Sequence, residues 1–230
     1  MALSIPFLPP ISKPGGALHM PAVYFDDFIT DSVFSETADN GDYLVTVVDA
    51  GTDNGEVVKI ADDAIGGQLT ITTNDADNDS VELQLNGESF KAEAEKSLIF
   101  EARIKGADVS EFDWFVGLSI TDTTVLAGVS DRIGFTSPDA TGDIDAVTEK
   151  DSTETLTDTT KDLADNTFVI LRFEVEGTSK VRFYVDSALV ATHTTNIPDD
   201  EALTPTLCIR NDGAAANTLT VDYVLAIQER

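Results

Sequence analysis

The sequence has few of the residues from which metal centres, disulfide frameworks and nucleophilic active sites are built. Its single cysteine, Cys208, excludes a disulfide within the chain and lies in an apolar run, where we expect a small core side chain. The two histidines, His19 and His193, have no cysteine or second histidine at ligand spacing, which argues against a zinc site. Neither a Gly-x-Ser-x-Gly motif nor a Walker loop occurs. The sequence therefore predicts no zinc enzyme, no serine hydrolase of that type and no P-loop NTPase.

Long apolar runs and positive charge are also scarce. No window reaches the roughly 18 apolar residues of a membrane-spanning helix, and prolines interrupt an N-terminal segment that has no basic start, so we expect no signal peptide. The chain has 14 Lys and Arg against 42 Asp and Glu, a net charge of −28. Such a surface repels phosphate backbones and anionic lipids, so neither nucleic acid nor a membrane is expected as a partner.

The acidic residues stop at a sharp boundary near the N-terminus. Residues 1–25 contain none of them, and five of the eight prolines fall within the first 21 residues. That proline density excludes a helix or a central strand and favours an extended, polyproline-like backbone. The segment is nevertheless too apolar for a disordered linker. We therefore predict an extended arm over residues 1–23, which lies either on a partner protein or, as a strap, on its own domain.

From Tyr24 onward the chain reads as short strands separated by turn residues. Apolar and polar residues alternate in Leu69–Thr72, Val81–Leu85 and Leu171–Glu176, while no stretch keeps a helical period for three turns. This pattern predicts one all-β domain, a sandwich or a barrel, over residues 24–230. Residues 142–166 are the least regular part, either a long loop or exposed strands. The expected strands are 56–60, 68–73, 81–85, 97–104, 114–120, 132–136, 169–176, 181–185, 189–194, 206–209 and 219–227.

The hairpin Val181–His193 begins a run of motifs that resembles the concanavalin A-like, laminin G-like jelly-roll group. The run continues through Ile197-Pro198 and Thr204–Asn211 to a closing strand at Val221–Leu225. The resemblance implies a concanavalin A-like jelly-roll β-sandwich whose first strand, from Tyr24, pairs with the last. Ser187 stands where the group usually has glycine, from which we expect a turn other than type I′ in this hairpin.

More closely, Thr46–Asp53, Leu69–Ser80 and Glu149–Thr155 resemble stretches of the structural proteins of tailed bacteriophages. The resemblance implies a virion protein made in the host cytoplasm, a capsid decoration (cement) or head-fibre protein on the capsid exterior. Its expected partner is the major capsid protein, and a homo-oligomer, with a trimer favoured, is expected as well. The alternative is a carbohydrate-binding adhesin module of a phage fibre, with a glycan as its partner. The residues expected to bind the partner are Ile5, Phe7, Leu8, Pro9, Pro10 and Ile11.

The jelly-roll group also contains glycoside hydrolases, whose retaining members need two carboxyl groups about 5 Å apart. The laminarinase-like enzymes supply them from a Glu-x-Asp-x-x-Glu strand. The nearest pattern here is Asp143, Asp145 and Glu149, in which the last carboxylate comes one residue late. The only tryptophan, Trp114, lies in an apolar run and is expected in the core. We therefore expect no catalytic residue and a protein that is not an enzyme.

A run of acidic residues offers a calcium candidate. Asp75, Asp77 and Asp79 place carboxylates at every second position, as calcium loops do. An EF-hand would continue with glycine at the sixth position and glutamate at the twelfth, where this chain has Ser80 and Asn86. A weak Ca²⁺ site and a polar hairpin turn are therefore both open, and no other cofactor is expected.

Overall fold

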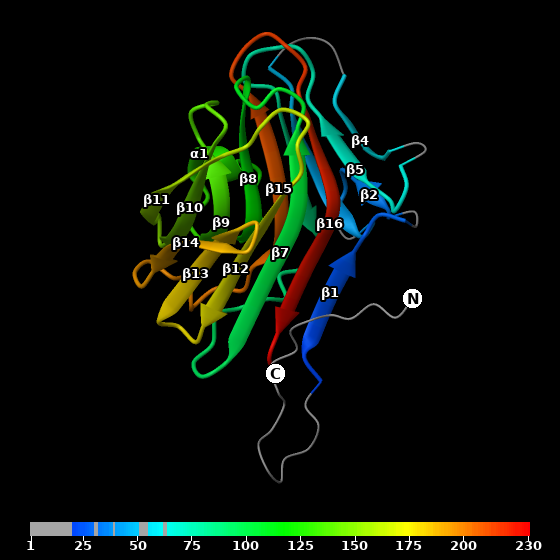
Figure 1. Ribbon diagram of the computed structural model, residues 1–230. Helices are drawn as coiled ribbons and strands as arrows, with labels where there is room; N and C mark the ends of the chain where they lie inside the picture. The colour runs from blue at the N-terminus through cyan, green and yellow to red at the C-terminus, as the bar shows by residue number, and fades with distance from the viewer. Residues whose placement is uncertain (1–19, 30–31, 39, 51–54, 62–63) are drawn as a thin grey trace.

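The computed structural model describes residues 20–29, 32–38, 40–50, 55–61 and 64–230, which form two β-sheets packed face to face (Figure 1). Sheet A has the order β14-β13-β12-β7-β16-β5-β4, and β1 also pairs with β16. Its strands are β1 (Ala22–Asp26), β4 (Val57–Ile60), β5 (Leu69–Thr72), β7 (Ser97–Gly106), β12 (Val169–Glu176), β13 (Lys180–Val185), β14 (Ala188–His193) and β16 (Thr218–Gln228).

Sheet B has the order β11-β10-β9-β8-β15-β6-β3-β2. Its strands are β2 (Phe34–Ser35), β3 (Tyr43–Val48), β6 (Ser80–Leu85), β8 (Phe112–Ser119), β9 (Arg132–Ser137), β10 (Asp143–Lys150), β11 (Thr153–Asp162) and β15 (Thr204–Asn211). The described helix is a single turn, α1 (Val125–Gly128). The prediction of an all-β sandwich is confirmed, and no helix in the described part of the chain is long and apolar enough to cross a membrane.

The core lies between the sheets and explains the alternation in the sequence. In β12 every second side chain, from Val169 to Val175, is buried against sheet B, while the residues between them face outward. Phe173 stacks on Phe100 of β7 with ring centroids 5.2 Å apart. From the opposite sheet, Trp114 is fully buried, as expected for a core residue. Each such side chain contributes about 1.5–3 kcal/mol through burial, so the facing apolar rows hold the two sheets together.

The pairing of the first strand with the last is also confirmed. The second half of β16 pairs antiparallel with β1, from Ala22 opposite Gln228 to Asp26 opposite Val224, while its first half pairs with β5. Figure 1 shows β1 beside the end of β16. The strand starts at Ala22, two residues before the predicted domain boundary. This pairing fixes residues 22–25, the end of the acid-free segment, to one margin of sheet A.

Two expectations from the sequence need correction or completion. Residues 142–166, left open between a loop and exposed strands, form the hairpin β10–β11; β11 is largely exposed, but β10 is mostly buried. The expected departure from a type I′ turn at Ser187 is wrong. Asp186 and Ser187 have φ values of 47° and 69°, and two positive φ values in a two-residue loop are what a type I′ turn requires. The twist of β13 and β14 imposes this conformation without a glycine.

Candidate functional site

The residues that the sequence indicated for partner binding lie outside the described part of the chain. They are Ile5, Phe7, Leu8, Pro9, Pro10 and Ile11, whereas the description begins at Met20. Their docking role therefore stays a prediction, and the alternatives of a partner-binding arm and an internal strap both stay open. The structure does describe the point where the acid-free segment enters the sandwich, at β1.

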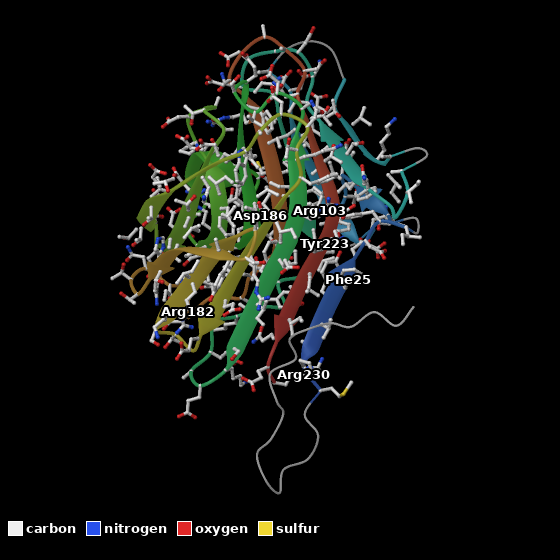
Figure 2. The ribbon with its side chains drawn as sticks, viewed as in Figure 1. Phe25, Arg103, Arg182, Asp186, Tyr223 and Arg230 are labelled. Atoms are coloured by element: carbon white, nitrogen blue, oxygen red, sulfur yellow. The ribbon has the colours of Figure 1, made fainter. Side chains whose placement is uncertain are left out.

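Apolar side chains gather on the outer face of sheet A where β1, β16 and β7 lie side by side. Residues of β1 alternate in burial, and Val23 and Phe25 are 57% and 50% exposed. Val23 lies opposite Ile227, and Ile227 lies opposite Ile99 of β7. Phe25 lies opposite Leu225, and its ring centroid is 6.2 Å from that of Tyr223 (Figure 2). We call this set the β1 patch: Val23, Phe25, Ile99, Tyr223, Leu225 and Ile227.

The charges beside the β1 patch nearly cancel. The charged residues of β7, β12, β13 and β16 are five basic and four acidic, which leaves these four strands at +1 in a chain of −28. They are paired on the sheet: Arg103 contacts Asp222 at 2.8 Å, and Arg182 contacts Glu176 at 2.9 Å. The hydroxyl of Tyr223 donates to Glu101 at 2.8 Å. This face is therefore where another surface can approach the protein without meeting its general negative charge.

The candidate carboxylates of β10 lie on the outer face of sheet B. Asp145 stands opposite Asp158 of β11, and Glu149 stands opposite Glu154, while a bulge between Asp143 and Asp145 shifts Asp143 out of this register. Residues directly opposite in an antiparallel pair have Cβ atoms about 5 Å apart. The structure thus assembles two carboxylate pairs that sequence spacing within β10 alone does not reveal.

The pKa values of two of these carboxylates, Asp145 and Glu149, are raised. Burial raises the pKa of Asp145, and the neighbouring carboxylates of Asp158 and Asp143 raise it further. Burial also raises the pKa of Glu149, although Arg132 opposes the shift through an ion pair in which Nε lies 2.8 Å from the carboxylate. The same guanidinium contacts Glu154 at 2.7 Å. A carboxyl with a raised pKa beside a second carboxylate is an arrangement that can transfer a proton.

Part of the same face is covered by the connection from β8 to β9. Residues 121–130, which we call the cover segment, include α1, and their side chains Val125 and Val129 pack against Phe115. Glu82 of β6 is buried beneath them, and burial raises the pKa of its carboxyl to about 7, with the backbone N–H of Val125 opposing the shift. Sequence reasoning missed Glu82, because in the alternating strand Val81–Leu85 a carboxylate at this position is expected to face solvent.

The calcium candidates do not come together as a set. Asp79 is fully buried and accepts hydrogen bonds from the backbone N–H groups of Ala50 (2.7 Å) and Ala76 (2.8 Å), whereas Asp75 and Asp77 are exposed. The carboxylates that do approach Asp79 are those of Asp49 and Glu56, all within 4.8 Å of one another. They belong to segments more than 20 residues away, so no spacing rule could find them. A Ca²⁺ requirement stays a prediction.

Comparison with known proteins gives the fold and the family. The family model described as SO2946-like, C-terminal domain, matches residues 67–222. A crystal structure of SO2946 from Shewanella oneidensis MR-1, a protein of unknown function, is similar over 97% of both chains, with 16% identity and a TM-score of 0.60. An endo-1,3-β-glucanase from Streptomyces sioyaensis is similar over 95% of this chain and 99% of its own, with 14% identity and a TM-score of 0.61. No curated protein matches the sequence.

A β-glucanase from Bacillus licheniformis covers 90% of this chain and 98% of its own, with 14% identity and a TM-score of 0.60. These neighbours confirm the predicted concanavalin A-like jelly-roll sandwich. They also correct the expectation that the chain is not an enzyme. That expectation rested on the spacing of Asp143, Asp145 and Glu149 and on the core position expected for the only tryptophan, and it is wrong because the solved structures sharing this fold include several glucanases. Identities of this size show the fold alone, so the reaction and its residues are not transferred.

Proposed function

This chain belongs to the SO2946-like, C-terminal domain family, and we propose that it is a structural protein of a tailed-phage virion. In this proposal it is a decoration or head-fibre protein that docks on the major capsid protein from outside. The observation that carries the proposal is the continuity of the acid-free segment with the β1 patch. Residues 1–25 contain no carboxylate, and their last residues, Val23 and Phe25, form the margin of the patch.

The division of charge supports attachment at this margin. A carboxylate forced into an apolar contact costs several kcal/mol unless it is neutralised or paired. The arm and the β1 patch can be covered without that cost, whereas most of the remaining surface of a −28 chain cannot. Covering the exposed halves of Val23 and Phe25 contributes about 1 kcal/mol each, since full burial of such a side chain contributes about 1.5–3 kcal/mol. Several arm residues would add similar amounts.

Oligomerisation follows from the same reasoning and remains part of the proposal. A few modest contacts per chain suffice for stable attachment when several linked copies bind one lattice. A trimer at a symmetry point of the coat would supply that multivalency. Because each chain carries −28, its copies repel one another except through a neutral face.

The test is binding to capsids that lack the protein, measured by co-sedimentation. Deletion of residues 2–20 is expected to leave a folded sandwich that no longer attaches, and Phe7→Asp with Leu8→Asp is expected to act similarly. Phe25→Asp in the β1 patch should weaken binding at least ten-fold. Leu189→Asp is the matched control, because Leu189 is 56% exposed and lies on β14, the edge strand at the other end of sheet A. Attachment at full occupancy after the deletion contradicts the proposal; unfolding after the deletion identifies the strap instead.

A glycan-binding adhesin is the alternative in which the same sandwich displays a carbohydrate site. Binding of the purified chain to defined glycans on an array, abolished by substitutions on one sheet face, would support it. In that case capsid attachment by the β1 patch is not required.

A second candidate function is hydrolysis of a β-glucan, which the opposed carboxylates of β10 and β11 favour together with the glucanase neighbours. Retaining glycosidases use two carboxyl groups about 5 Å apart, one of them with a raised pKa. The test is reducing-end release from β-1,3- and mixed-linkage glucans, with Glu149→Gln and Asp145→Asn as variants. Asp165→Asn is the control, because Asp165 lies on the loop between β11 and β12, outside both carboxylate pairs. Absence of release by the wild-type chain contradicts this candidate.

A further inference from the structure

The cover segment is fastened to sheet B by acceptors on or next to β6. The backbone N–H of Val125 donates to Oε1 of Glu82 at 2.9 Å, and that of Asp122 donates to Oε1 of Gln84 at 3.0 Å. The N–H of Thr121 donates to Glu88 at 2.6 Å. Three side chains spaced along one strand and its following turn thus hold the backbone of the segment.

The apolar contacts of the cover segment are separate from the main core. Val125 and Val129 pack with Phe115, Val147 and Cys208 in a cluster on the outer face of sheet B, whereas the main core lies between the two sheets. Small satellite clusters of this kind can open without exposing the rest of the core. Lifting of the segment would therefore leave the main core between the sheets covered.

Glu82 is the ionisable group at the centre of this contact. Its side chain is 2% exposed, and its Oε2 atom is buried without a hydrogen-bond partner among the described residues. The groups facing it are Asp122 on the cover segment and the thiol of Cys208 on β15. Burial raises the pKa of the Cys208 thiol, and the positive charges of Arg210 and Arg132 oppose that rise. The Cys208 thiol is only a weak hydrogen-bond donor to this carboxyl, so a charge on it would be poorly compensated beneath the closed segment, which is costly in a low-dielectric site.

We propose that Glu82 is a pH-sensitive latch: its neutral carboxyl keeps the cover segment closed, and its ionisation releases the segment and uncovers Phe115, Val147 and Cys208. The sign follows from the burial of the group. The pKa of Glu82 is raised from 4.5 to about 7 in the closed form, and opening returns the carboxyl to water. Opening therefore becomes easier as pH rises above 4.5, and the effect levels off above pH 7. Between pH 6 and pH 8 the opening equilibrium constant should rise about ten-fold.

Cys208 gives a single-site readout, because it is the only cysteine and lies beneath the cover segment. The rate of thiol modification is measured for the wild-type chain and for Glu82→Gln. The wild-type rate divided by the Glu82→Gln rate cancels the pH dependence of the reaction between thiol and reagent. We expect this ratio to rise about ten-fold from pH 6 to pH 8. Glu88→Gln is the matched control: this exposed carboxylate also holds the segment, and its loss should leave the wild-type pH profile intact.

Amide hydrogen exchange supplies an independent measurement on the unmodified chain, should Glu82→Gln fail to fold. After correction for intrinsic rates, the protection of the Val125 amide should fall about ten-fold from pH 6 to pH 8, while that of the Val116 amide in β8 stays constant. A ratio or a protection factor that is flat across this range overturns the latch. Parallel loss of protection at Val125 and Val116 also overturns it, because the opening would then be unfolding of the whole sandwich.

Discussion

Removal of the Arg132 guanidinium should strongly destabilise the sandwich, because Arg132 is the least exposed basic side chain among the ion pairs of the described residues. Arg132 lies between Glu149 and Glu154, at 2.8 Å and 2.7 Å, and the side chains of Arg132 and Glu149 are only 11% and 12% exposed. Arg132→Gln leaves the carboxylate of Glu149 buried without its counter-charge. Breaking a buried pair in this way costs about 3–5 kcal/mol. We expect a loss of about 3 kcal/mol at pH 7, because some water reaches the pair.

The pH dependence of this loss is part of the prediction. Without Arg132, the pKa of Glu149 rises further, since burial and Glu154 raise it and the opposing cation is gone. A carboxyl whose pKa is raised in the folded state stabilises the fold when protonated and loses that contribution as pH increases. The difference between wild type and Arg132→Gln should therefore be largest near pH 7 and shrink toward pH 5.

Urea denaturation followed by tryptophan fluorescence measures these free energies, since Trp114 is fully buried. The double variant Arg132→Gln with Glu149→Gln should recover at least half of the loss, because no unpaired charge remains. Arg172→Gln is the control: its ion pairs with Glu174 and Glu101 lie on the open face of sheet A, where about 1 kcal/mol or less is expected. A loss below 1 kcal/mol for Arg132→Gln, or one equal to the control, refutes the reasoning.

Three further predictions concern the fold and its assembly. Glu82→Gln should raise the free energy of unfolding at pH 8 by about 3 kcal/mol and leave it nearly unchanged at pH 4, as measured by urea denaturation. Equal effects at both pH values contradict the shift of the Glu82 pKa to about 7. Ser187→Gly should raise the unfolding free energy by about 0.5–1 kcal/mol, because the residue has a φ of 69°, and a lower midpoint in urea counts against the type I′ turn. Self-association should strengthen as the salt concentration rises from 0.05 M to 0.5 M, because salt screens the repulsion between chains that each carry −28. The mass is measured by light scattering, and a chain that is monomeric both in solution and on particles contradicts the predicted oligomer.

The sequence predicts the sandwich well because its signals are local. Alternation in β12 and the turn residues between strands come from burial on one face and from backbone geometry, both readable over a few residues. It predicts β10 poorly because this strand is covered on both sides: Ile144 and Ala146 face the main core, while Val147 meets the cover segment. Its partner β11 is largely exposed and rich in Thr and Asp, so residues 142–166 together resemble a loop in the sequence.

The candidate sites depend on contacts between distant segments, which spacing cannot give. Asp79 meets Asp49 and Glu56 instead of its loop neighbours, since the turn at Asn78, with a φ of 67°, breaks the expected alternation. In the sequence, the cover segment is indicated only weakly, by the apolar residues Val125 and Val129 four positions apart. Their neighbours in the sequence do not show which sheet face they cover. The β1 patch likewise cannot be predicted without the register between β1 and β16, which places Val23 beside Ile227 and Phe25 beside Leu225.

A density map of tailed-phage particles assembled in the presence of this chain tests the central proposal most directly. The proposal predicts sandwiches on the capsid exterior, with residues 3–11 against the major capsid protein and the β1 patch, including Phe25 and Ile227, turned toward the coat. Particles without the sandwich on their exterior, or with the sandwich attached by another face and the patch in solvent, would contradict it.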